Sequence, residues 1–323
     1  MAAPGSKLAL RLRPLPPPCK LPSLTPTWPV VFVAKCAKPT EPGRASTSTT
    51  STSATSPLPQ LPPPAPPPPQ PLAPFTWPRD PSNATTSTAN PNNYLMVKPE
   101  YALAYNNSRR IPRWVSWALN SSWIGSASRQ DDFRTDSTLP SNWYRVGGSD
   151  YSGSGYDRGH MAPSADRTSS TATNSATFLM TNMIPQAPDN NQGPWAELEN
   201  YTRSLITSGN EIYIIAGEYG DCGTGSNGRR CEIVTSSGNR IAVPARTWKV
   251  IVIVNSRGAG AGGVNNSTRV IAVDMPNDQG IRSVPWRNYR VTVRDIENRT
   301  GLNLLSNVPA SIQEVVETRR DTL

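Results

Sequence analysis

The sequence predicts an α+β fold in which helices pack on the faces of a mainly antiparallel sheet. Strand-like segments outnumber helical ones, and they lack the sustained strand–helix alternation that a parallel sheet requires. Two segments, 211–217 and 247–254, are almost wholly apolar. Such runs are typical of central strands that are buried on both faces.

Four further segments are expected to extend this sheet. Each combines apolar positions with the β-branched or aromatic residues that favour strands. They are Tyr94–Val97, Tyr101–Tyr105, Trp114–Leu119 and Arg269–Val273. The glycine-rich run 258–263 is predicted to be a loop between the strands at 247–254 and 269–273.

Three helices are predicted. The first has Pro194 at its first position and apolar residues on one face, with Gly209 as its C-cap. The second spans Asp295–Ser306, with Asp295 as its cap, and the third spans Ala310–Arg319.

Residues 1–80 are predicted to be a disordered tail, and residues 81–323 a single domain. Residues 45–56 are nearly all Ser, Thr and Ala, and residues 57–74 are mostly proline. Such tracts cannot bury enough apolar surface to offset the entropy of ordering. A tether is favoured over an SH3-type ligand for the proline run.

The start of the chain is a candidate targeting segment. It has no acidic residue before Glu41, and its apolar run 30–34 is shorter than the ~7–15 residues of a secretory signal core. We expect a secreted or periplasmic protein, with organelle targeting as the alternative. No run approaches the ~18 apolar residues of a membrane helix, so we expect no membrane association.

The formal net charge of +9 suggests an anionic partner, but its distribution weakens that argument. Residues 1–90 carry 8 basic and 2 acidic residues, and the remainder carries 24 and 21. Lys98 and Lys249 are the only lysines after residue 90. Arginine suits phosphate because its planar fork donates two parallel hydrogen bonds. A general arginine bias is an equal alternative.

Four cysteines are present. Cys222 and Cys231 bracket a short, turn-rich loop, so a disulfide is favoured over two free thiols, and it would imply an oxidising compartment. Cys19 and Cys36 lie in the tail. One histidine and these spacings exclude a Cys/His metal cluster.

His160 is the only histidine, and imidazole exchanges protons near neutral pH. Arg158 is a permanent cation suited to holding a phosphate. Gly159 permits a tight turn or a close approach to a ligand. A lone histidine is more often structural than catalytic, so a catalytic role needs support from elsewhere.

That support comes from the first predicted helix. Glu199 and Arg203 are four residues apart and share a helix face, and Asn191 lies just ahead of the helix. Asn191 could supply one oxygen to a hard cation such as Mg²⁺, and Glu199 could hold the metal's waters. Taken singly, a surface ion pair and an ordinary helix-entry asparagine are the more probable alternatives.

In combination, these residues resemble the DNA/RNA non-specific endonuclease family, whose metal site is of the ββα type. The similarity covers about residues 81–318 and is strongest to sugar-non-specific secreted bacterial nucleases. Four groups match in order: Arg129–Arg134, Asp157–Asp166, Asn182–Gln186, and the series Asn191, Trp195, Glu199, Arg203.

The resemblance implies a metal-dependent hydrolase of phosphodiester bonds in DNA and RNA that leaves 5′-phosphate oligonucleotides. His160 would be the general base, and Asn191 the ligand of Mg²⁺, with Mn²⁺ as an alternative. Arg203, Arg158 and Arg129 would stabilise charge on the phosphate. Asn182 would support either the histidine or the substrate.

Double- and single-stranded DNA, RNA and a protein inhibitor are the expected partners. Three other functions remain open: an idle nucleic-acid-binding module, a phosphodiesterase or phosphatase of small molecules, and the same nuclease acting as a toxin.

Overall fold

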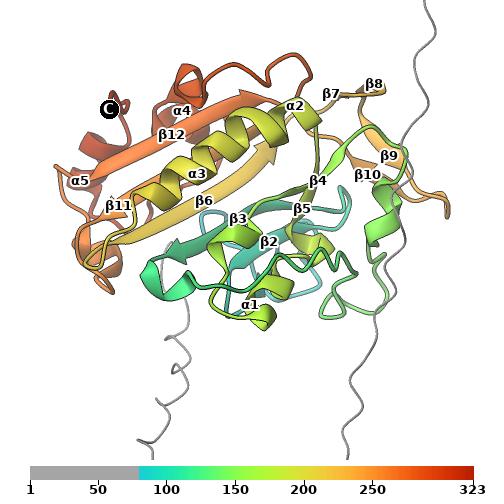
Figure 1. Cartoon of the computed structure of the whole chain (residues 1–323), viewed down its shortest axis with the longest axis horizontal. Helices are drawn as coiled ribbons and strands as arrows, with labels where there is room; N and C mark the ends of the chain where they lie inside the picture. The colour runs from blue at the N-terminus through green and yellow to red at the C-terminus, as the bar shows by residue number, and fades with distance from the viewer. Residues whose placement is uncertain (1–79) are drawn as a thin grey trace, which may run out of the picture. The chain divides into compact units, whose positions relative to one another are not determined.

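The main element of the computed structural model, which describes residues 80–323, is a seven-stranded sheet in the order β1-β2-β3-β6-β11-β12-β13. Every neighbouring pair of strands is antiparallel, which confirms the predicted α+β class (Figure 1). The strands are β1 (Tyr94–Val97), β2 (Ala102–Asn106), β3 (Ile111–Leu119), β6 (Glu211–Tyr219), β11 (Arg246–Val254), β12 (Arg269–Pro276) and β13 (Arg290–Val291).

Strands β6 and β11 form the centre of the sheet. They pair along their whole length, from Arg246 opposite Tyr219 to Val254 opposite Glu211. Successive side chains point to opposite faces of a strand. Ile214 accordingly joins one buried apolar cluster and Ile215 the other. Both faces are therefore covered, as the apolar runs predicted.

Helices cover the two faces of the sheet. Helix α3 (Ala196–Ser204) packs on one face, where Leu198 joins the first cluster, and Figure 1 shows it lying over β6. Helices α4 (Val293–Thr300) and α5 (Ala310–Val316) pack on the other face through Ile296 and Val316. A short helix, α1 (Thr171–Ala176), was not predicted.

The predicted bounds of the second and third helices were wrong. Thr292 is the N-cap of α4, because its side chain and that of Asp295 each accept a hydrogen bond from the other's backbone N–H. Helix α4 ends before Gly301, whose φ of +69° suits glycine, rather than at Ser306. The third helix, α5, ends at Val316 rather than Arg319.

The first predicted helix was also wrong at both ends. The chain turns helical at α2 (Pro188–Asn190), widens into a π-type turn at Asn191–Trp195, and continues as α3. Gly193 departs from helical geometry in the wide turn, and Pro194 has no N–H to donate there. Helix α3 is capped at Leu205, so Gly209 is not its cap.

Three two-stranded sheets flank the main one. They are β4 (Asp157–His160) with β5 (Met183–Gln186), β7 (Gly223–Gly225) with β8 (Gly228–Arg230), and β9 (Glu232–Val234) with β10 (Arg240–Ala242). Short 3₁₀ turns occur at Ser121–Trp123, Gly148–Tyr151, Ser164–Asp166, Met180–Asn182, Gly260–Gly263 and Trp286–Tyr289. The fifth of these lies within the predicted glycine-rich loop.

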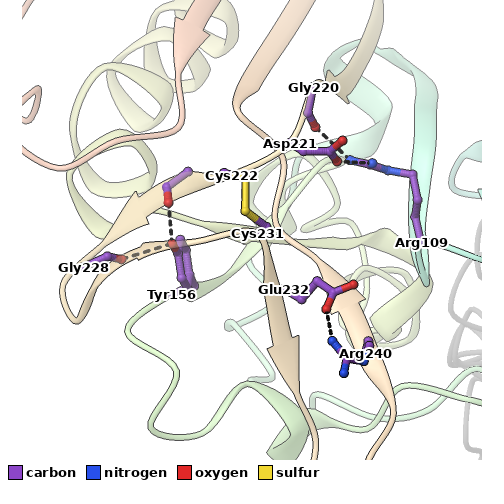
Figure 2. Close-up of a disulfide and its surroundings, with 10 residues drawn as sticks. Arg109, Tyr156, Gly220, Asp221, Cys222, Gly228, Cys231, Glu232 and Arg240 are labelled. Atoms are coloured by element: carbon purple, nitrogen blue, oxygen red, sulfur yellow. Dashed lines mark hydrogen bonds and ion pairs between the residues drawn. A yellow bond between two sulfur atoms is a disulfide. The ribbon is translucent and has the colours of Figure 1, made fainter.

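Cys222 and Cys231 are joined by the predicted disulfide, which closes the β7–β8 hairpin (Figure 2). Within residues 80–323, no helix has the length and apolar character needed to cross a membrane. The predicted tail, its candidate targeting segment and its two cysteines lie outside the described residues, except for Asp80.

We expect the change Cys222→Ser/Cys231→Ser to lower the free energy of unfolding by about 2–3 kcal/mol, because the disulfide closes a short loop in the unfolded chain. Urea denaturation of the oxidised proteins measures the difference. The wild type in reducing agent should match the variant, and the variant should not respond to reducing agent. Equal midpoints for oxidised wild type and variant would contradict a structural role for this disulfide.

Candidate active site

His160 lies at the end of β4, and its backbone is fixed by three elements. It is paired with Met183 of β5. Its carbonyl oxygen accepts a hydrogen bond of 3.3 Å from the indole Nε1 of Trp195. The next residue, Met161, donates its N–H to the carbonyl of Asn182. The histidine is therefore held between β5 and the wide turn.

Asn182 clamps the loop that follows the histidine. Its side chain is fully buried, accepts from the N–H of Ala162 at 3.0 Å, and donates to the carbonyls of Ala162 and Thr177. Of the two predicted roles, support of the histidine segment fits this geometry, because the amide is buried and all three of its hydrogen bonds go to backbone atoms.

Two phenylalanine rings enclose the imidazole. Phe133 and Phe178 lie with their ring centres 5.5 and 4.9 Å from that of His160, both edge to face. The guanidinium of Arg158 lies 3.8 Å over Phe133, and that of Arg129 lies 4.9 Å over Phe178. The sequence prediction did not assign a role to either ring.

The environment of His160 keeps it neutral. The residue is only 8% exposed, and its Nε2 is buried without a hydrogen-bond partner in the described part of the chain. Burial first, and then the charges of Arg129 and Arg158, lower the pKa of the imidazole to about 3. A neutral imidazole retains a nitrogen lone pair, so it can accept a proton.

Gly159 serves packing rather than the approach of a ligand. A Cβ at this position would lie 2.2 Å from Oε1 of Gln186, whose side chain crosses the strand pair. The predicted close approach therefore occurs, but to a neighbouring strand of the protein itself.

Asn191 lies beside β4 in the wide turn. Its Nδ2 donates to Asp157 at 2.8 Å, and Nε2 of Gln192 donates to the same carboxylate oxygen at 2.8 Å. One end of the turn is thus bonded to Asp157 through Asn191, and the other end is bonded to the carbonyl of His160 through Trp195. The Nδ2 bond also fixes the amide plane, and Oδ1 accepts no hydrogen bond from residues 80–323.

Helix α3 contributes two charged residues that face different partners. Oε1 of Glu199 lies 3.4 Å from Nζ of Lys249 on β11, and Lys249 is only 2% exposed. Arg203 donates to Asp166 at 2.8 Å and to Asn200 at 2.6 Å. The alternative of a surface ion pair between Glu199 and Arg203 is therefore not what forms.

Glu199 and Lys249, which face each other beneath α3, shift each other's pKa. Burial raises the pKa of Glu199, opposed by Lys249. Burial also lowers the pKa of Lys249, opposed by Glu199 and Asp166. The ammonium of Lys249 lies 3.9 Å from the ring centre of Trp195, a cation–π contact that offsets part of its burial cost.

The donor set fits a hard cation that retains its water. In residues 80–323, no cluster of three or more His, Cys, Asp and Glu side chains could enclose a metal. Mg²⁺ does not need such a cage, since it usually keeps several waters and binds few protein oxygens. Oδ1 of Asn191, which accepts no hydrogen bond within residues 80–323, is a donor atom of the kind that Mg²⁺ takes.

In this chain a strand pair that carries a histidine is followed by helical turns that carry an amide and a carboxylate. The chain belongs to the DNA/RNA non-specific endonuclease family, whose model matches residues 80–311.

Similar proteins are also nucleases by name. The chain is 51% identical over 242 residues to a nuclease from Nostoc sp. (strain PCC 7120), covering 75% of this chain and 84% of that one. It is 31% identical over 221 residues to mitochondrial endonuclease G from Homo sapiens, covering 67% and 71%. A solved EndoG/EndoGI complex, described as showing the mechanism of EndoG inhibition, matches with a TM-score of 0.55 and 25% identity, covering 70% and 94%.

In metal-free buffer, the single histidine resonance should titrate far below the ordinary value of about 6.5. Because the folded-state pKa lies below the unfolded one, the unfolded chain binds the proton first. His160 therefore lowers stability as the pH falls from about 6.5 towards about 3, by at most ~1.4 kcal/mol per pH unit. NMR titration of the full chain in EDTA measures the midpoint. Arg158→Gln should raise it, and a wild-type midpoint near 6.5 would contradict the buried, cation-flanked imidazole.

Proposed function

We propose that the protein is a Mg²⁺-dependent endonuclease that hydrolyses phosphodiester bonds of DNA and RNA without sequence preference. The observation that carries the proposal is a neutral, unpartnered imidazole close to two arginines, on a residue whose carbonyl is bonded by Trp195 at the end of the turn that holds Asn191. Family membership supports the nuclease activity, and the geometry supports the assignment of roles.

His160 acts as the general base in this proposal. Its neutral imidazole takes a proton from water as the water oxygen attacks phosphorus. The bond from phosphorus to the departing 3′ oxygen breaks, so the product keeps a 5′-phosphate. A positioned base of this kind typically accelerates reaction by ~10²–10⁴-fold.

Arg129 and Arg158 stabilise the charge that builds on the phosphate. Each stacks on one of the two phenylalanines that contact the imidazole, so both guanidinium groups lie close to it. Arg158 makes one hydrogen bond in the described chain, to the carbonyl of Gly148 at 3.2 Å, which leaves most of its donors free. Arg203 is the third proposed cation, oriented by Asp166 and Asn200.

Asn191 is the proposed metal ligand through Oδ1, and Glu199 orients the metal's waters. Mg²⁺, or Mn²⁺ in its place, would supply charge stabilisation at the departing oxygen. Asp157 holds the amide of Asn191 in place and takes no part in proton transfer.

Contacts confined to phosphate explain the expected range of substrates: double-stranded DNA, single-stranded DNA and RNA. We further propose a secreted or periplasmic location, because the disulfide requires an oxidising compartment. The relatives include mitochondrial enzymes, so organelle targeting is the alternative. An inhibitor protein is a proposed partner, because the structural relative was solved in an inhibitory complex.

His160→Ala should lower hydrolysis of plasmid DNA in Mg²⁺ by at least ~10²-fold, because the base is lost. Folding and binding to DNA in EDTA should be retained, and thermal melting together with anisotropy checks both. Duplex DNA, RNA and a small chromogenic diester are tested side by side, which distinguishes a nuclease from a small-molecule phosphodiesterase. Undiminished plasmid digestion by the variant would remove His160 from the mechanism.

Asn191→Ala should raise the Mg²⁺ concentration needed for half-maximal cleavage by at least tenfold, because an oxygen ligand is lost. Gln192→Ala is the matched control, since it removes a neighbouring amide that also donates to Asp157. The control should titrate as the wild type does. An unchanged metal titration for Asn191→Ala would show that Asn191 does not bind the metal.

A further inference from the structure

The hairpin of residues 222–231, called here the disulfide hairpin, packs on the segment that leads into β4 (Figure 2). The Tyr156 hydroxyl donates to the carbonyl of Gly223 at 2.7 Å. Ser226 donates its N–H to the carbonyl of Gly155 at 2.9 Å. Tyr156 directly precedes Asp157, so the hairpin abuts the strand that carries the catalytic base.

The contact between the two segments is tight. A Cβ on Gly155 would lie 2.7 Å from the backbone nitrogen of Asn227, and one on Gly225 would lie 2.5 Å from the carbonyl oxygen of Gly155. Side chains are thus excluded from both sides of the contact. The hairpin has a fixed position relative to β4.

The hairpin is also joined to the other half of the site. Thr224 donates its N–H to Asn277 and accepts from the N–H of Gln279. Asn277 in turn bonds to Ala187 at 2.7 Å, and Gln279 bonds to Asp189 at 2.9 Å. Ala187 and Asp189 lie just ahead of Asn191 in the chain and lead into its turn. The hairpin therefore spans both segments that form the active site.

The positive charge of the hairpin is not neutralised by the acidic residues on either side of it. Asp221 and Glu232, which flank the two cysteines, are paired with Arg109 and Arg240 (Figure 2). Arg229 and Arg230 on β8 are exposed, and neither guanidinium forms an ion pair or hydrogen bond within residues 80–323.

Two features of β8 set how these arginines are presented. Burial raises the pKa of the Tyr156 hydroxyl, and the charge of Arg230 opposes this rise, whereas the weaker effect of Asp278 adds to it. Neighbouring residues of a strand face opposite sides. The side chains of Arg229 and Arg230 therefore extend from opposite faces of the hairpin.

The hairpin lies a few nucleotides' distance from the general base His160. Tyr156 is four residues from His160 along an extended segment, so the base of the hairpin lies roughly 13 Å from the histidine at ~3.3 Å per residue. Successive phosphates of a duplex strand advance ~3.4 Å along the axis. Neighbouring phosphates of one strand lie farther apart in space than this axial rise, so that distance spans only a few nucleotides.

We propose that the disulfide hairpin is a second phosphate-binding element, in which Arg229 and Arg230 contact the nucleic-acid backbone a few nucleotides from the scissile bond. This inference rests on the proposed nuclease function. Guanidinium groups recognise phosphate oxygens without reading sequence, so the hairpin adds affinity for long substrates and leaves the chemical step unchanged.

Binding in EDTA tests the proposal. Arg229→Gln/Arg230→Gln is compared with Arg257→Gln/Arg320→Gln, which removes the same charge from exposed arginines near the opposite end of the sheet. Anisotropy with a 30-base-pair duplex is measured against salt concentration. The slope of log K against log[salt] is negative, and each lost phosphate contact reduces its magnitude by about 0.9. We expect a decrease of about 1–2 for the hairpin variant and less than half of that for the control, and equal decreases would overturn the proposal.

Cleavage kinetics separate this inference from the proposed function. The hairpin variant should raise KM for the duplex at least threefold, with kcat within twofold, and should cleave a small chromogenic diester as the wild type does. An unchanged KM for the duplex would remove the hairpin from substrate binding while leaving the nuclease assignment intact. If the wild-type protein cleaves neither substrate in Mg²⁺, the proposed function itself fails.

Discussion

The ion pair between Lys249 and Glu199 is the contact on which the construction of the site depends. Lys249 belongs to the central strand β11, and Glu199 belongs to α3, so the pair fixes the helix over the sheet. Both groups are largely withdrawn from water, and loss of one partner of such a pair typically costs ~3–5 kcal/mol. The same helix continues from the turn that holds Asn191. Its rotation and height on the sheet therefore set the position of the proposed metal ligand.

The surroundings of His160 combine two requirements in one set of side chains. Arg129 and Arg158 are suited to attract phosphate, and their charges also help to keep the imidazole unprotonated. A bound phosphate carries the opposite charge, so it opposes the arginines and makes the imidazole a stronger base. Phe133 and Phe178 support both functions, since each packs against the imidazole and carries one guanidinium on its face.

The sheet could be predicted from the sequence because its central strands are continuous apolar runs, which have few other interpretations. Helix ends were predicted less well. Gly301 stops α4 within an apolar pattern that continues beyond it, and Pro194 has the sequence appearance of a helix start although it lies inside a wide turn. Both errors arise because local patterns compete with geometry that only the folded chain defines.

The candidate site residues were chosen by residue type and by the resemblance to a family, and their roles stay predictions. Phe178 and Lys249 were not predicted to be near these residues, because they reach them from distant positions in the chain, and Phe133 lay in a matched segment without an assigned role. An isolated phenylalanine or lysine has no periodic signature, and its neighbours are set by tertiary packing. Lys249 was conspicuous as one of two lysines after residue 90, but composition alone does not show which carboxylate it meets.

The wide turn at Asn191–Trp195 has a consequence for the lengths that this segment can tolerate. A helix advances about 100° per residue, so a single deletion between β5 and α3 would turn Glu199 away from Lys249 by more than a quarter of a circle. The turn is bonded at Asp157 and at the carbonyl of His160, so it cannot slide to compensate. An insertion or deletion in this segment would therefore misplace Glu199 even if every side chain of the turn were kept.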